Sequence, residues 1–408
     1  MKKIFLMMAL AWSQCFAMQA QTLPEVSLSR QDTAEVVLPW PVNVQTRLDS
    51  LTKDTLFERT QLGLMVYDLS ADSVLYSYGG KQTLRPASTM KLLTSVTALD
   101  LLGSGYAFRT YLYYKGKIAQ GVLSGDVWLV GSMDPLFDET DMRIFAETLH
   151  RVGVDTIRGR IMQDISFKEE QLLGEGWCWD DDNPQLTPLL ISRKDEFASQ
   201  FKDELTRCGV FVDAPVSTDR LPRDKDVLLV CSRSHALREV LEPMMKESDN
   251  LYAESMFYQI AASTSKRPAE AAHARQLIKQ LLTRAGVTGV QYRIADGSGL
   301  SLYNYVTPEL MIRLLRYAYL KRDVMAALYP SLPVAGVDGT LEKRMTKGFA
   351  YENVHAKTGT VSGVSSLAGY CRAANRHLLA FCIINQGVMK NADGRNFQDQ
   401  VCEAMCKP

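Results

Sequence analysis

The sequence predicts a mixed α/β protein that contains an antiparallel sheet and helices alternating with strands. Residues 62–78 form two apolar runs around a Ser-Ala-Asp-Ser turn, the pattern of a hairpin. Residues 364–372 and 377–384 flank an Ala-Ala-Asn turn and predict a second antiparallel pair. Between them a pattern of Arg, Gly and Val recurs at wide spacing and predicts helix ends followed by strands. The expected fold class is therefore α/β (α+β). The three copies of the pattern are residues 149–154, 205–210 and 282–287.

Length and composition suit an enzyme of more than one domain. The 408 residues exceed what a single core usually holds, and the 46% hydrophobic content is that of a globular protein. Lys plus Arg and Asp plus Glu number 46 each, so no overall field attracts nucleic acid or an anionic membrane. We expect no nucleic-acid partner.

The N-terminus has the pattern of a secretory signal peptide, which we place at residues 1–20. Lys2 and Lys3 precede an apolar run over 4–12, and small residues follow at Ala17 and Ala20. A lipoprotein attached through Cys15 is the alternative, but the glutamine before it fits poorly. No later apolar stretch is long enough to span a bilayer, so we expect no transmembrane segment. The predicted location is periplasmic, with a peripheral membrane association left open.

Cysteine and histidine usage argues against several kinds of site. Seven cysteines remain after the signal peptide, an odd and scattered set that does not describe a disulfide framework. They are expected to be small buried side chains, with room for one bridge. None has metal-ligand spacing, and the five histidines are too dispersed for a histidine-dependent hydrolase. We therefore expect neither a metal nor a cofactor.

Three short motifs occur in one order along the chain, and their order is the informative observation. They read S-x-x-K from Ser88 to Lys91, S-x-N from Ser248 to Asn250, and K-T-G from Lys357. The second and third each occur once, whereas S-x-x-K is also present at three other serines. Together they are typical of serine acyl transfer in penicillin-binding proteins and class A β-lactamases. The other three serines, which we interpret as surface residues, are Ser50, Ser199 and Ser263.

The first motif supplies a nucleophile and a base. A serine hydroxyl is a weak nucleophile until a neighbouring base takes its proton. Ser88 and Lys91 stand three residues apart at the start of an apolar-periodic segment, so they share one face of a helix. Burial beside that apolar stripe would disfavour the ammonium form of Lys91. The N–H of Ser88, at a helix N-terminus, could help to bind an oxyanion.

The second and third motifs have both a functional and a structural interpretation. Asn250 stands where two helical stretches meet, so it is either a helix cap or a hydrogen-bonding partner of a substrate amide. Lys357 lies in a predicted strand and could supply positive charge to a carboxylate. In that strand Lys357 and Gly359 share one face, and Thr358 and Thr360 share the other. Gly359 would let a ligand backbone come close.

Beyond these motifs, the sequence resembles the D-alanyl-D-alanine carboxypeptidase/endopeptidase family, the low-molecular-mass class C penicillin-binding proteins. The resemblance covers nearly all of the chain after the signal peptide. It implies a penicillin-binding/β-lactamase-like transpeptidase fold, with a five-stranded antiparallel sheet flanked by helices and an inserted α/β domain. The further matching segments are residues 176–181, 296–301, 332–341 and 356–370.

The resemblance also implies a division into domains. The catalytic domain would comprise residues 21–105 and 236–408, and the inserted domain residues 106–235. The interval between Lys91 and Ser248 is too short for both inserted domains of the longer relatives, so we expect one.

The family's functional residues can be carried over position by position. The resemblance makes Ser88 the acylated nucleophile and Lys91 its base. It places Thr358 and Thr360 at the terminal carboxylate of the substrate, and the N–H groups of Ser88 and Thr360 in the oxyanion hole. Asp181 would bind a free amino group of a peptidoglycan side chain; the alternative is aromatic packing of Trp177 and Trp179 with Asp181 as a capping residue. The residues expected to complete the hydrogen-bonded relay are Ser248, Asn250 and Lys357.

The implied activity is that of a serine-type D-Ala-D-Ala carboxypeptidase or crosslink endopeptidase acting on peptidoglycan stem peptides. β-Lactam antibiotics are expected to acylate Ser88. One departure concerns recognition of the stem: Leu302 stands where family members often have an arginine that can pair with a side-chain carboxylate. The alternatives are a β-lactamase, which often needs an extra glutamate for deacylation, and a non-catalytic β-lactam- or wall-binding module.

Overall fold

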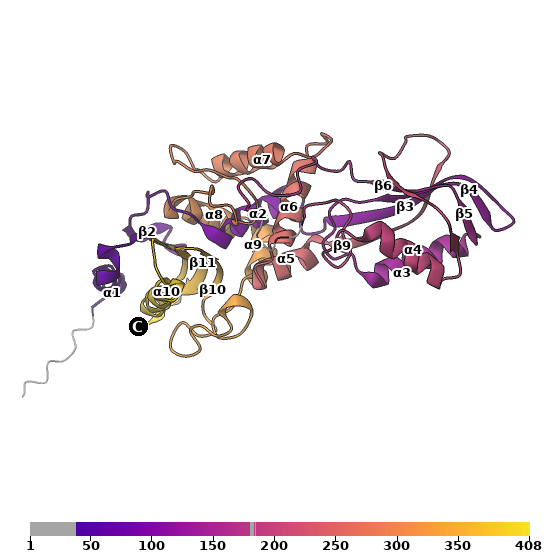
Figure 1. Ribbon diagram of the computed structural model, residues 1–408. Helices are drawn as coiled ribbons and strands as arrows, with labels where there is room; N and C mark the ends of the chain where they lie inside the picture. The colour runs from indigo at the N-terminus through magenta and orange to yellow at the C-terminus, as the bar shows by residue number, and fades with distance from the viewer. Residues whose placement is uncertain (1–37, 180–182, 184) are drawn as a thin grey trace, which may run out of the picture. The chain divides into compact units, whose positions relative to one another are not determined.

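The computed structural model describes residues 38–179, 183 and 185–408 (Figure 1). The predicted signal peptide and Asp181 therefore lie outside the described residues. No helix in the described part of the chain is long and apolar enough to cross a membrane.

A five-stranded antiparallel sheet is formed by strands from both ends of the chain. Its order is β10-β11-β12-β1-β2, and every neighbouring pair is antiparallel. Both predicted strand pairs are present, and the predicted five-stranded sheet is confirmed. The strands are β1 (Gln61–Asp68), β2 (Ser73–Tyr78), β10 (His355–Val361), β11 (Val364–Arg372) and β12 (Leu378–Gln386).

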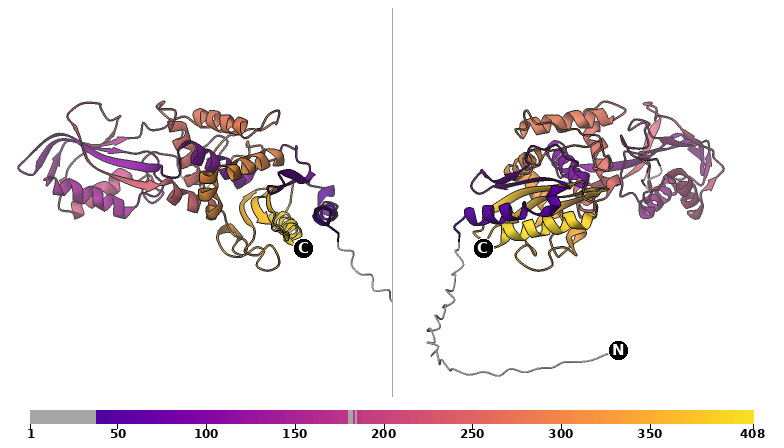
Figure 2. Two further views of the ribbon diagram at one scale, coloured as in Figure 1. Left: turned by 180° about the vertical axis from the view of Figure 1, so that it is seen from behind. Right: turned by 60° about the vertical axis from the view of Figure 1, so that its left-hand side comes forward.

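Both faces of this sheet are covered by helices, which is why eight of the nine residues of its central strand are buried. Leu379 and Phe381 of β12 point to a core shared with α1 (Val42–Leu51) and α10 (Asn391–Cys406), which lie side by side (Figure 2). The alternate residues point to a second core on the other face, as the two-residue period of a strand requires. Both faces are thus closed to water.

The second core contains the helices that position the candidate site. The turn η2 (Ala87–Met90) leads directly into α2 (Lys91–Leu101), which packs against α6 (Asn250–Ala262). α8 (Pro308–Leu320) lies on β1 and β12. The remaining helical elements of this part are η1 (Thr55–Glu58), α5 (Leu237–Lys246), α7 (Ala271–Arg284), α9 (Arg322–Ser331) and η3 (Gly339–Leu341).

Residues between α2 and α5 form a second, seven-stranded sheet. The long antiparallel strands β3 (Ala107–Ala119), β4 (Val122–Val130) and β9 (Val227–Ala236) are extended by short parallel strands. α3 (Glu139–Arg151) and α4 (Phe197–Arg207) pack side by side over one face (Figure 1). The division at residues 106 and 235 stays a prediction. The short strands are β5 (Thr156–Arg158), β6 (Ile161–Asp164), β7 (Phe211–Val212) and β8 (Val216–Thr218).

The recurring Arg-Gly-Val pattern ends three helices, as expected, but it does not always begin a strand. Gly153, Gly209 and Gly286 follow α3, α4 and α7 with φ of 95°, 84° and 80°, where a side chain would be strained. The first two are followed by β5 and β7. No strand stands directly after Gly286; the next regular element of the described chain is α8.

The cysteines of the described residues are all free. Four of the seven are buried, in agreement with their interpretation as small apolar side chains.

Candidate active site

The candidate nucleophile lies in a tight turn at the N-terminus of a buried helix. Ser88 belongs to the 3₁₀ turn η2, and Lys91 is the first residue of α2. Residues three apart eclipse one another in a 3₁₀ turn, which brings the two side chains together. Ala87, just before the serine, has φ 47°, a conformation that is uncommon for a residue with a side chain. Ser366 on β11 donates a hydrogen bond to Pro86 O at 2.6 Å and ties the turn to the sheet.

Lys91 is fully buried and makes three hydrogen bonds through its Nζ atom. It donates to Ser88 Oγ at 3.1 Å, to Asn250 Oδ1 at 2.7 Å and to the carbonyl oxygen of Ser298 at 2.8 Å. Burial lowers the pKa of Lys91 to about 8, although nearby carboxylates oppose the shift. The amine can therefore lose its proton near neutral pH while it remains in contact with the serine.

The second motif brings Asn250 to this lysine and leaves the capping role to its neighbour. Asp249 caps α6 by accepting a hydrogen bond from Tyr252 N at 3.3 Å, and it forms an ion pair with Arg193. Asn250 is thus free to accept from Lys91. Ser248 has φ 64°, and its hydroxyl has no hydrogen-bond partner within the described residues. Its role in the relay stays a prediction.

The third motif lies on β10, beside the turn that contains Ser88. Lys357 is fully buried, and its Nζ donates to Thr358 O at 2.8 Å. Burial and the charge of Lys91 hold the pKa of Lys357 well below its usual range. Thr358 Oγ1 donates to Thr340 Oγ1 at 2.7 Å, whereas Thr360 is exposed at the edge of the sheet.

Gly359 is required by the close approach of β10 to the serine. A Cβ atom at this position would lie 2.9 Å from Ser88 N and 2.8 Å from Pro86 O, and it would collide with Ser366 Oγ. Two of these neighbours are backbone atoms that cannot move aside cheaply. The glycine of the third motif therefore fits β10 against Ser88.

A buried loop forms the floor of the site and presents the Ser298 carbonyl to Lys91. Glu254 Oε1 accepts hydrogen bonds from Gly297 N at 3.0 Å and Ser298 N at 2.8 Å. Asp296 accepts from the backbone N–H of Ser301 at 2.7 Å. Burial raises the pKa of Glu254 to about 8, opposed by the Ser298 hydrogen bond and the charge of Lys91.

Sequence reasoning missed Glu254, although a signal was present. It is an acidic residue four positions after Asn250, in a helix with eleven buried residues. An acidic side chain at such a position needs buried donors to satisfy it.

Comparison with known proteins decides the family. A model described as the D-Ala-D-Ala carboxypeptidase 3 (S13) family matches residues 44–193 and 186–407. The chain belongs to this family. Membership confirms the predicted family and the predicted enzyme class, a serine-type D-Ala-D-Ala carboxypeptidase.

Two relatives of this S13 family member match over most of their length. D-alanyl-D-alanine carboxypeptidase DacB of Haemophilus influenzae is 25% identical, over 84% of this chain and 88% of that protein. A D-alanyl-D-alanine carboxypeptidase of an Actinomadura species is 27% identical, over 83% and 80%. The crystal structure of penicillin binding protein 4 from Haemophilus influenzae matches with a TM-score of 0.79 at 24% identity, covering 87% of this chain and 97% of its own. This likeness confirms the predicted fold.

The tryptophan segment of this S13 chain is tied to the floor of the site. Trp177 is buried, and its Nε1 donates to Asp296 Oδ2 at 2.8 Å. Trp179 is 86% exposed, so the two tryptophans do not form the packed cluster that the alternative interpretation of Asp181 assumed. Asp181 itself lies outside the described residues.

A cation does lie beside Leu302, the residue at the family's usual arginine position. Arg85, three residues before Ser88, donates from Nε to the carbonyl oxygen of Leu302 at 3.1 Å, and its guanidinium lies 5.7 Å from the ring centre of Tyr305. The remaining guanidinium nitrogens have no hydrogen-bond partner in the described part of the chain.

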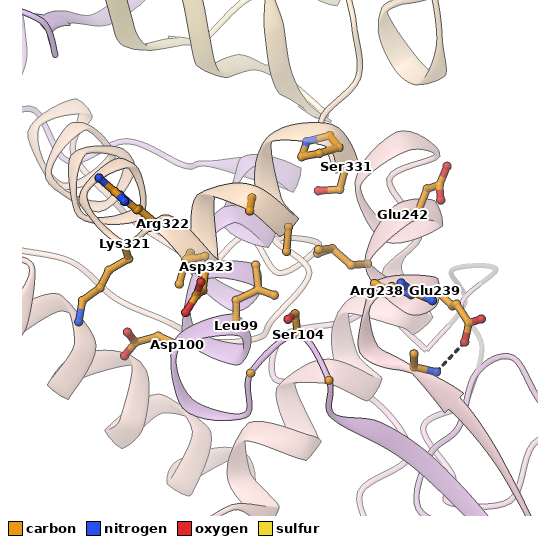
Figure 3. Close-up of a pocket in the computed structure, with 18 residues that line it drawn as sticks. Leu99, Asp100, Ser104, Arg238, Glu239, Glu242, Lys321, Arg322, Asp323 and Ser331 are labelled. Carbon is orange, nitrogen blue, oxygen red and sulfur yellow. Dashed lines mark hydrogen bonds between the residues drawn. The ribbon is translucent and has the colours of Figure 1, made fainter.

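A hollow of about 1440 Å³ between α2, α5 and α9 is distinct from this site (Figure 3). Asp100 in its wall already accepts hydrogen bonds from Arg284 at 2.6 Å and Tyr317 at 2.9 Å. Asp100 lies near the end of α2, roughly 13 Å along the helix from Lys91. The other charged side chains that line the hollow are of both signs, which is typical of a solvated surface. No group of three or more metal-ligating side chains occurs among the described residues.

The pKa of Lys91 predicts how acylation depends on pH. Only the unprotonated amine can take the serine proton, so acylation of Ser88 by a fluorescent penicillin should accelerate as pH rises and level off above about 8. Asn250→Asp would place a carboxylate against Lys91, favour the ammonium form and move the midpoint to higher pH. An acylation rate constant that does not vary between pH 6 and pH 9, measured by stopped flow, would contradict this role.

Stability and acylation should both depend on the hydrogen bonds that the Glu254 side chain accepts. Glu254→Met leaves two buried N–H groups unpaired, each at a cost of about 1–3 kcal/mol, and should lower both the free energy of unfolding and the acylation rate. Glu254→Gln keeps an acceptor oxygen and should retain most of both. Urea denaturation and acylation kinetics compare the two variants. If Glu254→Gln lost as much stability and acylation rate as Glu254→Met, the hydrogen-bonding role would be disproved.

Proposed function

We propose that this S13 enzyme is a serine DD-peptidase that cleaves the D-Ala-D-Ala bond of peptidoglycan stem peptides through an acyl-enzyme on Ser88. The observation that supports this most is the contact between the buried Lys91 amine and Ser88 Oγ, because a lysine with a pKa of about 8 can act as the base.

The proposed reaction proceeds in two steps. Ser88 Oγ attacks the carbonyl between the two D-alanines while Lys91 takes the hydroxyl proton. The C–N bond then breaks, and the leaving amine of D-alanine takes up a proton passed from Lys91. A water molecule next attacks the ester, Ser88 regains its proton, and the shortened peptide leaves. Asn250 keeps the Lys91 amine in place throughout.

Binding of the substrate is assigned to β10. Thr358 and Thr360 hold the terminal carboxylate near the Lys357 amine, and the N–H groups of Ser88 and Thr360 bind the oxyanion. The exposure of Thr360 and the tight fit of Gly359 against Ser88 support this placement. Ser248 relays protons between the leaving group and Lys91. Asp181 binds a free amino group of the stem.

β-Lactams are proposed to acylate the same serine. The Haemophilus influenzae penicillin binding protein 4 has been crystallised in complex with a β-lactam, and it shares this fold. The predicted signal peptide supports a periplasmic location, where peptidoglycan is accessible. Endopeptidases from Bdellovibrio bacteriovorus match with TM-scores of 0.53 to 0.56, and cleavage of crosslinks would use the same chemistry.

A fluorescent penicillin and two peptides test the proposal. Wild-type protein should form a stable adduct and release D-alanine from a pentapeptide ending in D-Ala-D-Ala, and Ser88→Ala should do neither. Ser50→Ala, in another S-x-x-K sequence, is the matched control and should behave as wild type. Rapid turnover of the penicillin would indicate a β-lactamase, and an adduct without peptide cleavage would indicate a binding module. A crosslinked dimer separates endopeptidase from carboxypeptidase activity.

Arg85 is proposed to replace the missing arginine at Leu302. Arg85→Gln should lower kcat/KM about tenfold for a stem peptide whose third residue carries a side-chain carboxylate, because it removes a charge-assisted pairing. The loss should be absent for a peptide with an uncharged residue there. Equal effects on the two peptides would mean that Arg85 only supports the loop around Leu302.

A further inference from the structure

A second groove lies on the seven-stranded sheet, away from the candidate active site. It has a volume of about 1020 Å³ and runs between the start of β3, the loop at 220–224 and the end of α6. Its wall includes Tyr106, Tyr111 and Phe167, whose rings offer apolar faces.

Four arginines line this groove: Arg109, Arg220, Arg223 and Arg267. None of them forms an ion pair with a carboxylate within the described residues. Eleven other arginines of the described residues form such ion pairs, whereas this groove brings together four arginines that do not. The groove thus gathers positive charge that the protein does not neutralise.

The two acidic residues in its wall are already engaged. The oxygens of Asp164 accept hydrogen bonds from Ser166 N at 2.9 Å and Leu221 N at 2.8 Å. Asp224 is paired with Lys115 at 2.5 Å. These contacts hold the loop that carries Arg220 and Arg223, and they leave the net charge of the lining positive.

Part of the groove is held in place before any ligand binds. Arg267 donates to the carbonyl oxygens of Ala262 at 3.0 Å and Lys266 at 2.9 Å, and its guanidinium lies 5.5 Å from the ring centre of Phe167. Tyr106 donates to Gln259 Oε1 at 2.6 Å. Arg267 and Arg109 both lie close enough to Tyr106 to oppose the rise of its pKa that burial causes. Both guanidiniums thus contribute positive charge on the side of the groove where Tyr106 lies.

The groove and the candidate active site are linked by one helix. α6 begins at Asn250, which contacts Lys91, and its last turns contribute Gln259 and Ala262 to the groove. A helix of 13 residues is about 20 Å long. A small peptide at Ser88 cannot occupy both places, whereas a polymer can.

We propose that this groove binds a peptidoglycan strand, a glycan whose stem peptides carry carboxylates, while another stem of the same polymer occupies the Ser88 site. The inference rests on the proposed function. Guanidinium groups pair with carboxylates in a planar fork, and the aromatic faces accept sugar rings. The groove is thus a secondary binding site that favours polymeric over soluble substrate.

The test compares two triple variants of the full-length enzyme. Arg109→Gln, Arg220→Gln and Arg223→Gln remove three guanidiniums that form no hydrogen bond or ion pair within the described residues, so the fold is retained. KM for uncrosslinked peptidoglycan strands should rise about tenfold, equivalent to about 1.4 kcal/mol of binding. KM and kcat for a soluble D-Ala-D-Ala peptide should not change. The matched control replaces Arg151, Arg158 and Arg322, which are exposed, unpaired within the described residues and outside the groove.

The outcomes separate this inference from the proposed function. Equal KM values for peptidoglycan strands in the two triple variants would overturn the groove as a binding site. Cleavage of the soluble peptide would still support the DD-peptidase function. Failure of wild-type protein to cleave the soluble peptide or to bind penicillin would overturn the function itself. If nucleic acid or a sulfated glycan competed as well as peptidoglycan strands did, the groove would be a general polyanion site and the assigned ligand would be wrong.

Discussion

The burial of one lysine amine beside one serine hydroxyl organises this structure. Lys91 Nζ is removed from water and held by Ser88, Asn250 and the Ser298 carbonyl, which come from three separate parts of the chain. A buried ammonium is unfavourable without such partners, and the same burial lowers its pKa toward neutrality. The start of α2, the start of α6 and the loop at 296–301 must therefore meet at one point. The proposed chemistry depends on that meeting.

Close backbone packing is the second constraint. The turn that carries Ser88 is enclosed by β10 on one side and by the loop at Gly299 on the other, where a Cβ atom would collide with Ala87 O. Ala87 and Ser248 both have positive φ, and such conformations persist only where the surroundings enforce them. The sheet, buried on both faces, provides a rigid support, because Ser366 anchors the turn directly to β11.

Much of the fold and part of the site could be predicted from local pattern. The hairpin at 62–78, the strands around the third motif and the helix junction at Asn250 follow from hydrophobic periodicity and turn residues, which act locally. Local pattern could not decide whether Asn250 caps α6 or binds Lys91, because that depends on Asp249 taking the cap. Glu254 was missed because its partners lie in a loop 43 and 44 residues away. Arg85 beside Leu302 is likewise a contact between distant segments.

The proposed mechanism depends on the protonation state of Lys91 in the unliganded enzyme. The most direct measurement is a ¹⁵N NMR titration of the Lys91 Nζ signal, assigned by comparison with a Lys91→Arg variant. A midpoint near 8 is the expected result, since burial outweighs the neighbouring carboxylates. A midpoint at or above the ordinary value of 10.5 would show that the amine stays charged, and it would contradict Lys91 as the base.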